Sequence, residues 1–335
     1  IGLHAAWVVG LICALFGGRP GMISGSAGAL ASVSAGFVSA DGTGVEELFL
    51  SVLGAGLLVL VAAAFRVGRF LPLVPATVMI GFCNGLAVVI GKAQLAWFTD
   101  RDGQWLDGRV LWCTAVQCLV AFGIMVVMPR ITRKLPASLI ALAIGVLIEE
   151  LFFRSWLEVS TVTIGDKSRF DSSDALPKLF FLDSRYDLRN VRSLRTVVVQ
   201  SCTLAIVAIL ESLMTLEVVN DMTRTQGEPN RQVWALGVAN VIAGLLGTMG
   251  GNALIELSVM NVQAGGQRRA SSTLVALGVL AIVAFASPVL NYVPCGTLAG
   301  IMLLVVLDTA KWSSLPAVAA SLVPAGALAA QPAAR

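Results

Sequence analysis

Hydrophobic residues run through this chain in long stretches, and polar residues gather in the short segments between them. Most of the stretches are long enough to cross the roughly 30 Å hydrocarbon core of a bilayer as helices. The expected spans, about eleven in number, cover residues 2–16, 22–40, 48–65, 72–98, 110–128, 135–153, 196–219, 232–249, 252–263, 270–290 and 294–308. The pattern therefore predicts an all-α, polytopic helical membrane protein.

Composition supports this class and weakens the case for an enzyme. The 335 residues are 57% hydrophobic and 13% charged, with a mean hydropathy of +0.85. A soluble domain is about 45–50% apolar and about 25% charged. The single histidine, His4, and the scattered cysteines offer neither metal-ligand spacing nor a nucleophile–base set, so no catalytic residue, metal site or cofactor is expected. The expected partner is the lipid bilayer, and not nucleic acid.

The charges of the short loops indicate how the chain is threaded. When the spans alternate sides, every short basic loop falls on one face, which the positive-inside rule makes cytoplasmic. These loops carry Arg19, Arg66, Arg69, Arg130, Arg133, Lys134, Arg224, Arg231, Arg268, Arg269 and Lys311. Residue 1 then lies outside, and one further span is expected to precede it. The charges do not identify the membrane, although the plasma membrane is favoured.

The threading also divides the chain. Residues 1–308 form the expected transmembrane domain, and the connection 154–195 within it is an extracytoplasmic loop. Residues 309–335 form an Ala/Pro-rich tail without the pattern of a folded domain.

Two glycine-rich segments interrupt the apolar pattern, one in each half of the chain. Residues 17–32 read GGRPGMISGSAGALAS, and residues 247–266 read GTMGGNALIELSVMNVQAGG. Each continues as a short apolar run, which indicates a broken helix packed inside protein. By the threading the first short helix runs outward and the second inward, an arrangement typical of inverted-repeat transporters.

The N-termini of two such half-helices should face each other near the middle of the membrane. Their unpaired N–H groups and positive dipole ends favour an anion. Glycine-mediated helix packing is the alternative explanation. The opposite directions of the two segments favour the transport site.

Glu211 lies deep in the apolar run 196–219, where a carboxylate is costly and marks an ion or proton path by default. Thr215 follows one helical turn later on the same face, so the pair could hold a small cation or a proton. A structural hydrogen bond to a neighbouring helix is the alternative role for Glu211. Glu256, in the second short helix, would oppose anion binding unless it is neutral, paired or turned away.

Five stretches of the chain resemble the SulP sulfate permease family of anion transporters, whose animal members include pendrin and prestin. They read PATVMIGFCNGLAVVIGKAQL (75–95), LPASLIALAIGVL (135–147), TVTIGD (161–166), LESLMTLEVVNDMTRTQGEPNRQ (210–232) and GVANVIAGLLGTMGGNALIELSVMNVQAGGQRR (237–269). The resemblance covers about residues 2–308. It implies a UraA-like fold of seven-plus-seven inverted repeats with a core and a gate domain, and commonly a homodimer or a larger membrane assembly.

The resemblance also implies site residues. Glu211 matches the acidic position of the family's (D/E)SLLT helix, which contributes to the cation site of Na⁺-coupled members, and Thr215 matches its threonine. Backbone amides at the openings of the two half-helices hold the anion in this family. The matching positions here are Ser26, Ala27, Gly28, Ala253, Leu254 and Ile255.

The chain departs from the family pattern in three respects. Glu256-Leu257-Ser258 stands where many members have Gly-Gln before Ser. The first span of the first repeat is expected to be absent. The last spans and the STAS domain are also expected to be absent, with the Ala/Pro tail in their place.

The leading prediction is a secondary active transporter of a small inorganic anion, such as sulfate, bicarbonate or chloride. It would work by alternating access, with Na⁺ or H⁺ as a possible coupling ion. The alternative is a truncated or degenerate homologue that serves as a structural subunit without transport. A nucleobase permease shares the architecture, but the MTRTQGEPNRQ run argues against it.

Overall fold

The computed structural model describes residues 2–38, 44–73, 76–100, 103–131, 137–167, 179, 193–285, 287–310 and 312. Most of the tail 309–335 and of the loop 154–195 lies outside these residues, so those two predictions are untested. The described helices and strands are α1 (Gly2–Phe16), β1 (Ser24–Gly25), α2 (Gly28–Ala35), α3 (Val45–Ala64), η1 (Val67–Leu73), α4 (Ala76–Gln94), η2 (Leu95–Trp97), α5 (Gly108–Ile131), α6 (Ala137–Leu147), η3 (Ile148–Arg154), α7 (Ile164–Lys167), α8 (Leu194–Thr223), α9 (Pro229–Leu245), β2 (Asn252–Ala253), α10 (Ile255–Gln263), α11 (Arg269–Phe285), α12 (Ser287–Leu290) and α13 (Cys295–Thr309).

Each predicted span contains a helix at its expected place. A run of apolar residues forms a helix because its backbone must satisfy its own hydrogen bonds, whether the helix faces lipid or other helices. Within the described residues, α3, α5 and α8 are long and apolar enough to cross a membrane, and α1, α11 and α13 are shorter apolar helices. Large hydrophobic side chains such as Phe65, Trp112 and Leu274 are exposed on the helices' outer faces. Such a surface suits contact with lipid tails rather than water.

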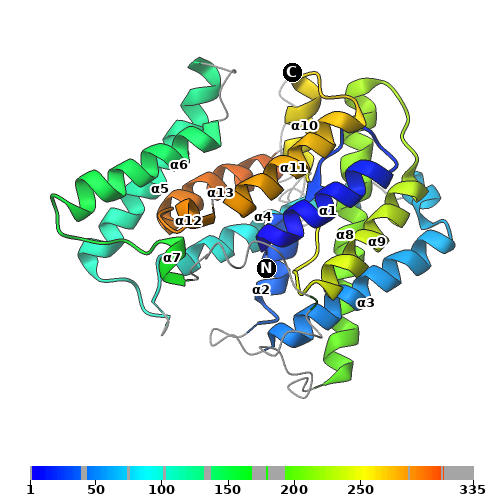
Figure 1. Cartoon of the computed structure of the whole chain (residues 1–335), viewed down its shortest axis with the longest axis horizontal. Coiled ribbons are helices and arrows are strands. Elements are labelled where there is room, and N and C mark those ends of the chain that lie inside the picture. The colour runs from blue at the N-terminus through cyan, green and yellow to red at the C-terminus, as the bar shows by residue number, and fades with distance from the viewer. Residues whose placement is uncertain are drawn as a thin grey trace, which may run out of the picture.

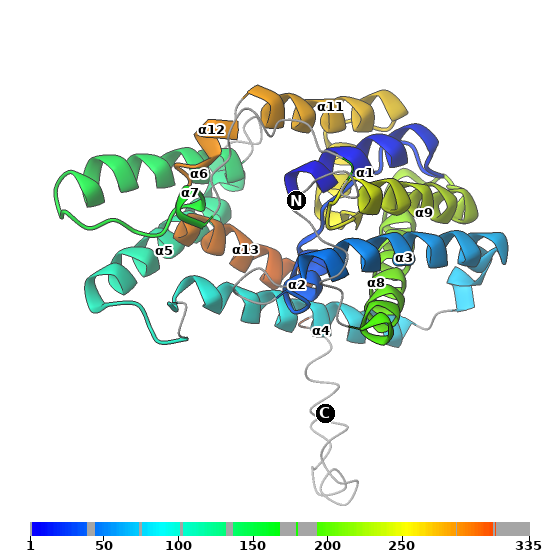
Figure 2. The same cartoon turned by 60° about the horizontal axis from the view of Figure 1, so that its bottom comes forward.

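One helical group consists of α1, α3, α8, α9 and α11. Figure 2 shows α11, α1, α9 and α3 lying in successive layers, with α8 crossing them. Glycines allow the close approach of α3 and α9: a Cβ on Gly56 would lie 2.5 Å from the Val241 nitrogen, and one on Gly244 would lie 2.6 Å from the Leu53 nitrogen. Glycine-mediated helix packing therefore occurs between α3 and α9, outside the two glycine-rich interruptions for which it was the alternative explanation.

A second group consists of α4, α5, α6 and α13, and Figure 1 shows α5 and α6 at the opposite end of the molecule from α3 and α9. A fully buried carboxylate, Glu149 of η3, joins α5 to the segment that follows η3. Its Oε2 accepts hydrogen bonds from Gln117 Nε2 and Thr161 Oγ1, both at 2.7 Å, and its Oε1 accepts one from the Thr161 amide at 2.9 Å. Arg154 adds an ion pair at 3.3 Å.

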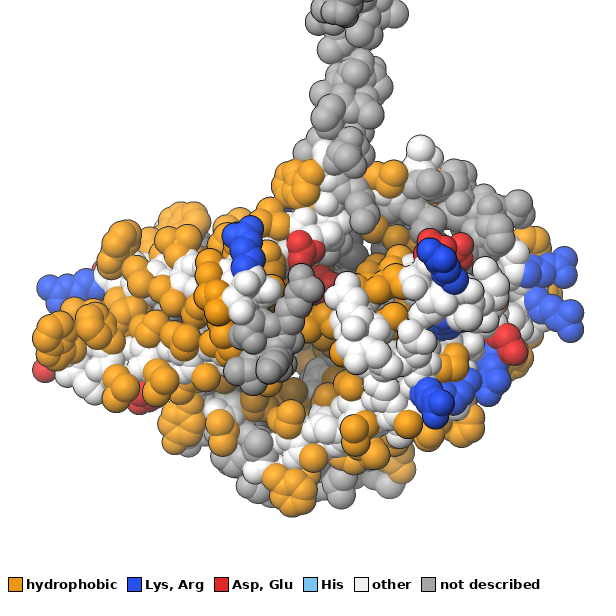
Figure 3. All heavy atoms as spheres, turned by 90° about the horizontal axis from the view of Figure 1, so that it is seen from above, with side chains coloured by type: hydrophobic (Ala, Val, Ile, Leu, Met, Phe, Trp, Pro, Cys, Tyr) orange, Lys and Arg blue, Asp and Glu red, His pale blue; other side chains and the backbone are white. Residues whose placement is uncertain are grey.

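Three of the predicted basic loops, those of Arg19, Arg231 and Arg269, lie together at the end of the first group. Arg231 Nε donates to the Phe16 carbonyl at 3.1 Å, and Arg269 donates to the carbonyls of Ala14, Leu15 and Gly17. These contacts cap the C-terminus of α1, whose last carbonyls have no partner inside the helix. Figure 3 shows basic side chains gathered at this end of the molecule, on a face that is otherwise largely hydrophobic.

Candidate functional site

The two glycine-rich segments meet in space as a pair of short strands. Strand β1 pairs with β2 in an antiparallel register, with Ser24 opposite Ala253 and Gly25 opposite Asn252. Each strand leads directly into a short helix, β1 into α2 and β2 into α10. Because the strands are antiparallel, the two helices leave the crossing in opposite directions, as Figure 1 shows for α10 and α2.

Glycine allows the strands to approach this closely. A Cβ added to Gly251 would lie 2.2 Å from the Gly25 carbonyl oxygen, well inside van der Waals contact. A side chain at Gly251 would therefore push the strands apart. The glycine richness of the two interruptions follows in part from this backbone contact.

Neither short helix has a side-chain cap at its N-terminus. The N-cap of α2 is Ala27 and that of α10 is Leu254, both with extended backbone and no side-chain hydrogen bond. The first amide to close a helical bond is that of Ala31 in α2, at 2.9 Å from the Ala27 carbonyl, and that of Ser258 in α10, at 3.0 Å from the Leu254 carbonyl. Amides before these residues have no acceptor within their own helix.

The predicted amide donors of α10 are partly used within the protein. The amide of Ala253 donates to Ser212 Oγ at 3.1 Å, and that of Leu254 donates to the Ile23 carbonyl at 2.9 Å. Of the three predicted residues, this leaves Ile255 at the first position of α10. The amides of Glu256 and Leu257 follow it in the same first turn, before the first intrahelical donor, Ser258.

The first segment places its predicted residues beside β1. Ser26 Oγ lies 3.4 Å from the Met249 sulfur, which comes from the loop before β2. Ala27 is buried, and Gly28 begins α2. A Cβ on Gly28 would meet nothing within 4 Å, so there is open space at the start of this helix.

Glu211 lies in the middle of α8 and is buried, as the sequence predicted for an intramembrane acid. Its Oε2 accepts a hydrogen bond from Asn252 Nδ2 of strand β2. The carboxylate is therefore attached to the lead-in of α10. The Oδ1 atom of the same Asn252 side chain is buried and has no hydrogen-bond partner among the described residues.

Thr215 is fully buried one turn below Glu211. Its hydroxyl donates to the Glu211 backbone carbonyl at 2.7 Å. The hydroxyl oxygen still has lone pairs that could accept a hydrogen bond or bind a cation. The structure thus brings the two predicted residues together through the helix backbone, and not through their side chains.

Two polar residues of this region, Asn252 and Ser212, escaped the sequence analysis, which named Ser258 only as part of a family motif. Asn252 and Ser212 join β2 to α8, and Ser258 joins α10 to the segment before β1, where its Oγ accepts from the Ile23 amide at 2.9 Å. A single small polar residue in an apolar run gives no signal of its partner. Only the Asn252 position beside two glycines offered a hint.

Arg19 is a buried cation of the nearby loop, but it is occupied elsewhere. Its guanidinium donates to the Thr225 carbonyl at 3.0 Å and to the hydroxyls of Thr223 and Thr225, at the C-terminal end of α8. Burial lowers the pKa of this guanidinium from its usual value, although an arginine stays charged near neutral pH. Arg19 therefore caps the C-terminal end of α8 and does not contact Glu211.

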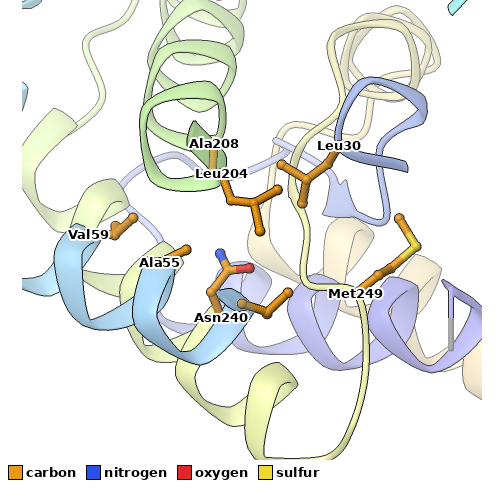
Figure 4. Close-up of a pocket in the computed structure, with 8 residues that line it drawn as sticks. Leu30, Ala55, Val59, Leu204, Ala208, Asn240 and Met249 are labelled. Atoms are coloured by element: carbon orange, nitrogen blue, oxygen red, sulfur yellow. The ribbon is translucent and has the colours of Figure 1, made fainter. Parts of the chain in front are cut away.

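An apolar hollow beside α2 does not provide the anion site. Figure 4 shows its lining, in which Asn240 is the one polar side chain, with Leu30, Val52, Ala55, Val59, Leu204, Ala208 and Met249. The Asn240 amide group already bonds the backbone of Leu236 and Gly251. A hollow without a free donor stays dry and cannot replace the hydration of an anion.

Opposed, uncapped half-helices beside a buried acid define a class of protein: helical membrane transport proteins with broken helices. The sulfate permease family matches residues 1–327, and the chain belongs to this family.

Individual relatives agree with this assignment. The chain is 31% identical over 315 residues to YbaR of Bacillus subtilis (strain 168), a protein named as a proposed sulfate transporter; the match covers 94% of this chain and 62% of that protein. It is 28% identical to the bicarbonate transporter BicA of Synechocystis, over 94% of this chain and 57% of BicA. The chain thus spans about 60% of the length of these curated relatives.

Solved structures share the fold. The transmembrane domain of a cyanobacterial bicarbonate transporter BicA superposes with a TM-score of 0.79 at 26% identity, covering 94% of this chain and 81% of that domain. SLC26A9 superposes with a TM-score of 0.69 at 14% identity, covering 94% of this chain and 54% of that chain, and shows likeness of fold alone. The expected UraA-like helical fold is therefore confirmed.

Proposed function

We propose that this chain forms the transmembrane unit of a secondary transporter for a small inorganic anion. The observation that carries the proposal is the antiparallel pairing of β1 with β2, which sets two uncapped helix N-termini at one point. Partial positive charge at both helix ends favours an anion there, and no cationic side chain is needed.

The anion would be held by the first turns of the two short helices. On one side these are the amides of Ser26, Ala27 and Gly28, and on the other side the amide of Ile255 and those that follow it. Ala253 and Leu254 would act by shaping the turn, because their amides are used by Ser212 and Ile23. Relatives named for sulfate and for bicarbonate support an oxyanion as substrate; chloride is the further candidate.

Glu211 would couple anion movement to a cation or a proton. The acid is buried, and its described side-chain contact is the amide of Asn252, so a bound cation or proton would neutralise it. An uncompensated acid in a membrane costs about 2.5–3.5 kcal/mol by insertion scales. Alternating access would move the group containing α8, α2 and α10 against the group of α5, α6 and α13.

A structural subunit without transport is not favoured. Such a protein would have no need to keep the paired half-helices or the contact between Glu211 and Asn252, and both are present. The matched relatives are named as transporters.

The test is uptake of radiolabelled sulfate, bicarbonate and chloride into proteoliposomes that contain the full chain. Na⁺ and pH gradients are imposed separately. Uptake of one anion above that of protein-free vesicles is expected, and Ala253→Trp should abolish it without preventing membrane insertion. Insertion is checked by size-exclusion chromatography of the extracted variant. Normal uptake by Ala253→Trp would place the anion elsewhere.

A further inference from the structure

Glu256 occupies the second position of α10, in the same first turn whose amides the proposed anion would use. A carboxylate at this position complements the positive end of the helix dipole. The dipole therefore has two candidate partners, the ionised side chain of Glu256 and the transported anion. Both are negative, so they compete for the same helix end.

Two other acidic residues act on Glu256, and no basic residue of the described chain forms an ion pair with it. Glu211 of α8, the helix packed against α10, interacts electrostatically with Glu256, and so does Asp308 of α13. The other acids of α8, Glu217 and Asp221, are exposed on its surface. The ion pairs among the described residues all involve Arg154, so no Lys or Arg of these residues pairs with Glu256.

Arg19 does not neutralise Glu256 either. Its guanidinium donates to Thr223, Thr225 and the Val219 carbonyl, at the C-terminal end of α8 and away from Glu211. Glu256 is itself only partly exposed. An ionised Glu256 beside a bound anion would thus be a like-charge contact at low dielectric, which costs more than the same contact in water.

We infer that Glu256 takes up a proton when the anion binds, so that each anion held at the start of α10 is accompanied by a proton on this side chain. The inference rests on the proposed anion site. The neutral carboxyl group no longer competes for the helix end, and its O–H can donate a hydrogen bond to an anion oxygen. On release of the anion the proton leaves as well, and the carboxylate again complements the α10 dipole. Glu256 is therefore a specificity and coupling residue, distinct from the cation site at Glu211.

The sign of the pH dependence follows from this competition. At low pH Glu256 is protonated and the anion binds tightly. As the pH rises, the proton concentration falls and protonation of Glu256 becomes less favourable, so the apparent affinity for the anion falls. The fall approaches tenfold per pH unit once Glu256 is ionised in the empty site.

The experiment measures initial rates of radiolabelled sulfate uptake into proteoliposomes at external pH values from about 5.5 to 8.5, with the membrane potential clamped. Sulfate is the probe because it stays a dianion over this range. In the unmodified chain the apparent KM should rise with pH. Glu256→Gln, which mimics the protonated acid, should give a low KM that no longer changes with pH.

Two variants serve as controls. Glu217→Gln removes an exposed acid of α8 and should leave the pH profile unchanged. Glu256→Asp keeps a titratable acid, and it should keep a pH-dependent KM even if its affinity is lower. Glu256→Asp also serves if the Gln variant does not insert, because a pH-independent KM in Glu256→Asp would contradict the inference.

The outcomes separate this inference from the function on which it rests. If the unmodified chain takes up none of sulfate, bicarbonate and chloride at any pH, the proposed function fails, and the inference fails with it. If sulfate uptake is robust but Glu256→Gln keeps the original pH profile, the inference alone is wrong. If the pH dependence of KM disappears in Glu211→Gln and persists in Glu256→Gln, the proton belongs to Glu211.

Discussion

The side-chain amide of Asn252 donates a hydrogen bond to the carboxylate of Glu211, 41 residues away in the chain. This contact joins the long helix α8 to the strand that begins the second half-helix. Ser212 of α8, which accepts from the Ala253 amide, makes a second link between the same two elements. We expect these contacts to couple the proposed anion and cation sites.

Asn252→Ala should weaken coupling in particular. Loss of a donor to a buried carboxylate costs about 1–3 kcal/mol, which corresponds to a change of roughly 5- to 150-fold in the half-saturating concentration of the coupling ion. The measurement is uptake against Na⁺ concentration and, separately, against pH.

Asn261→Ala is the matched control for that change. Asn261 Nδ2 donates to the carbonyls of Gly21 and Gly266, both at 2.8 Å, at the other end of α10. Both variants should lower the melting temperature, and only Asn252→Ala should change the ion dependence. An equal change in both would show that the effect is general destabilisation.

Gly251→Val should disrupt the pairing of β1 with β2. A Cβ at this position meets the Gly25 carbonyl oxygen at 2.2 Å, and backbone cannot yield as a flexible side chain can. We expect loss of uptake and a drop in melting temperature. Gly278→Ala in α11 is the control, since its Cβ would meet nothing within 4 Å; a helical glycine replaced by alanine gains up to about 1 kcal/mol. Wild-type behaviour of Gly251→Val would contradict the observed strand register.

Glu149→Gln should destabilise the protein by about 1.5–3 kcal/mol, because it removes a buried charged hydrogen-bond acceptor. The Thr161 amide and Arg154 at Oε1 can only donate, so the amide oxygen of a Gln would have to lie there. Its NH₂ would then face the Gln117 NH₂, with the Thr161 hydroxyl as its one possible acceptor among these partners. The readout is thermal unfolding in detergent. Glu150→Gln, which removes a half-exposed partner of Arg154, should change stability by less than about 1 kcal/mol.

Arg19→Ala should lower the melting temperature more than Arg224→Ala. The Arg19 side chain is buried and bonds the C-terminal end of α8, whereas Arg224 is exposed at the same helix end. Removal of a charged donor from such buried acceptors costs about 1.5–3 kcal/mol. Similar melting temperatures for the two variants would mean that the buried contacts of Arg19 are not needed for stability.

The sequence by itself determined the helices and the two interruptions. A span is set by the hydrophobicity of its own residues, because a backbone in lipid must satisfy its hydrogen bonds within the helix. Glycines marked both broken segments, and Glu211 was conspicuous as an acid within an apolar run. The family resemblance then supplied the positions of the amide donors.

Only the tertiary structure decided which of the donors in α10 are used within the protein and what each acid contacts. Ala253 and Leu254 looked like Ile255 in sequence, yet their amides are used by Ser212 and Ile23, which come from α8 and from the segment before β1. The cluster around Glu149 likewise joins residues that have no local relation. Hydrophobic periodicity is a property of each segment, but a hydrogen bond between segments depends on register and distance across the fold, and a single sequence encodes these only through the packing of the whole chain.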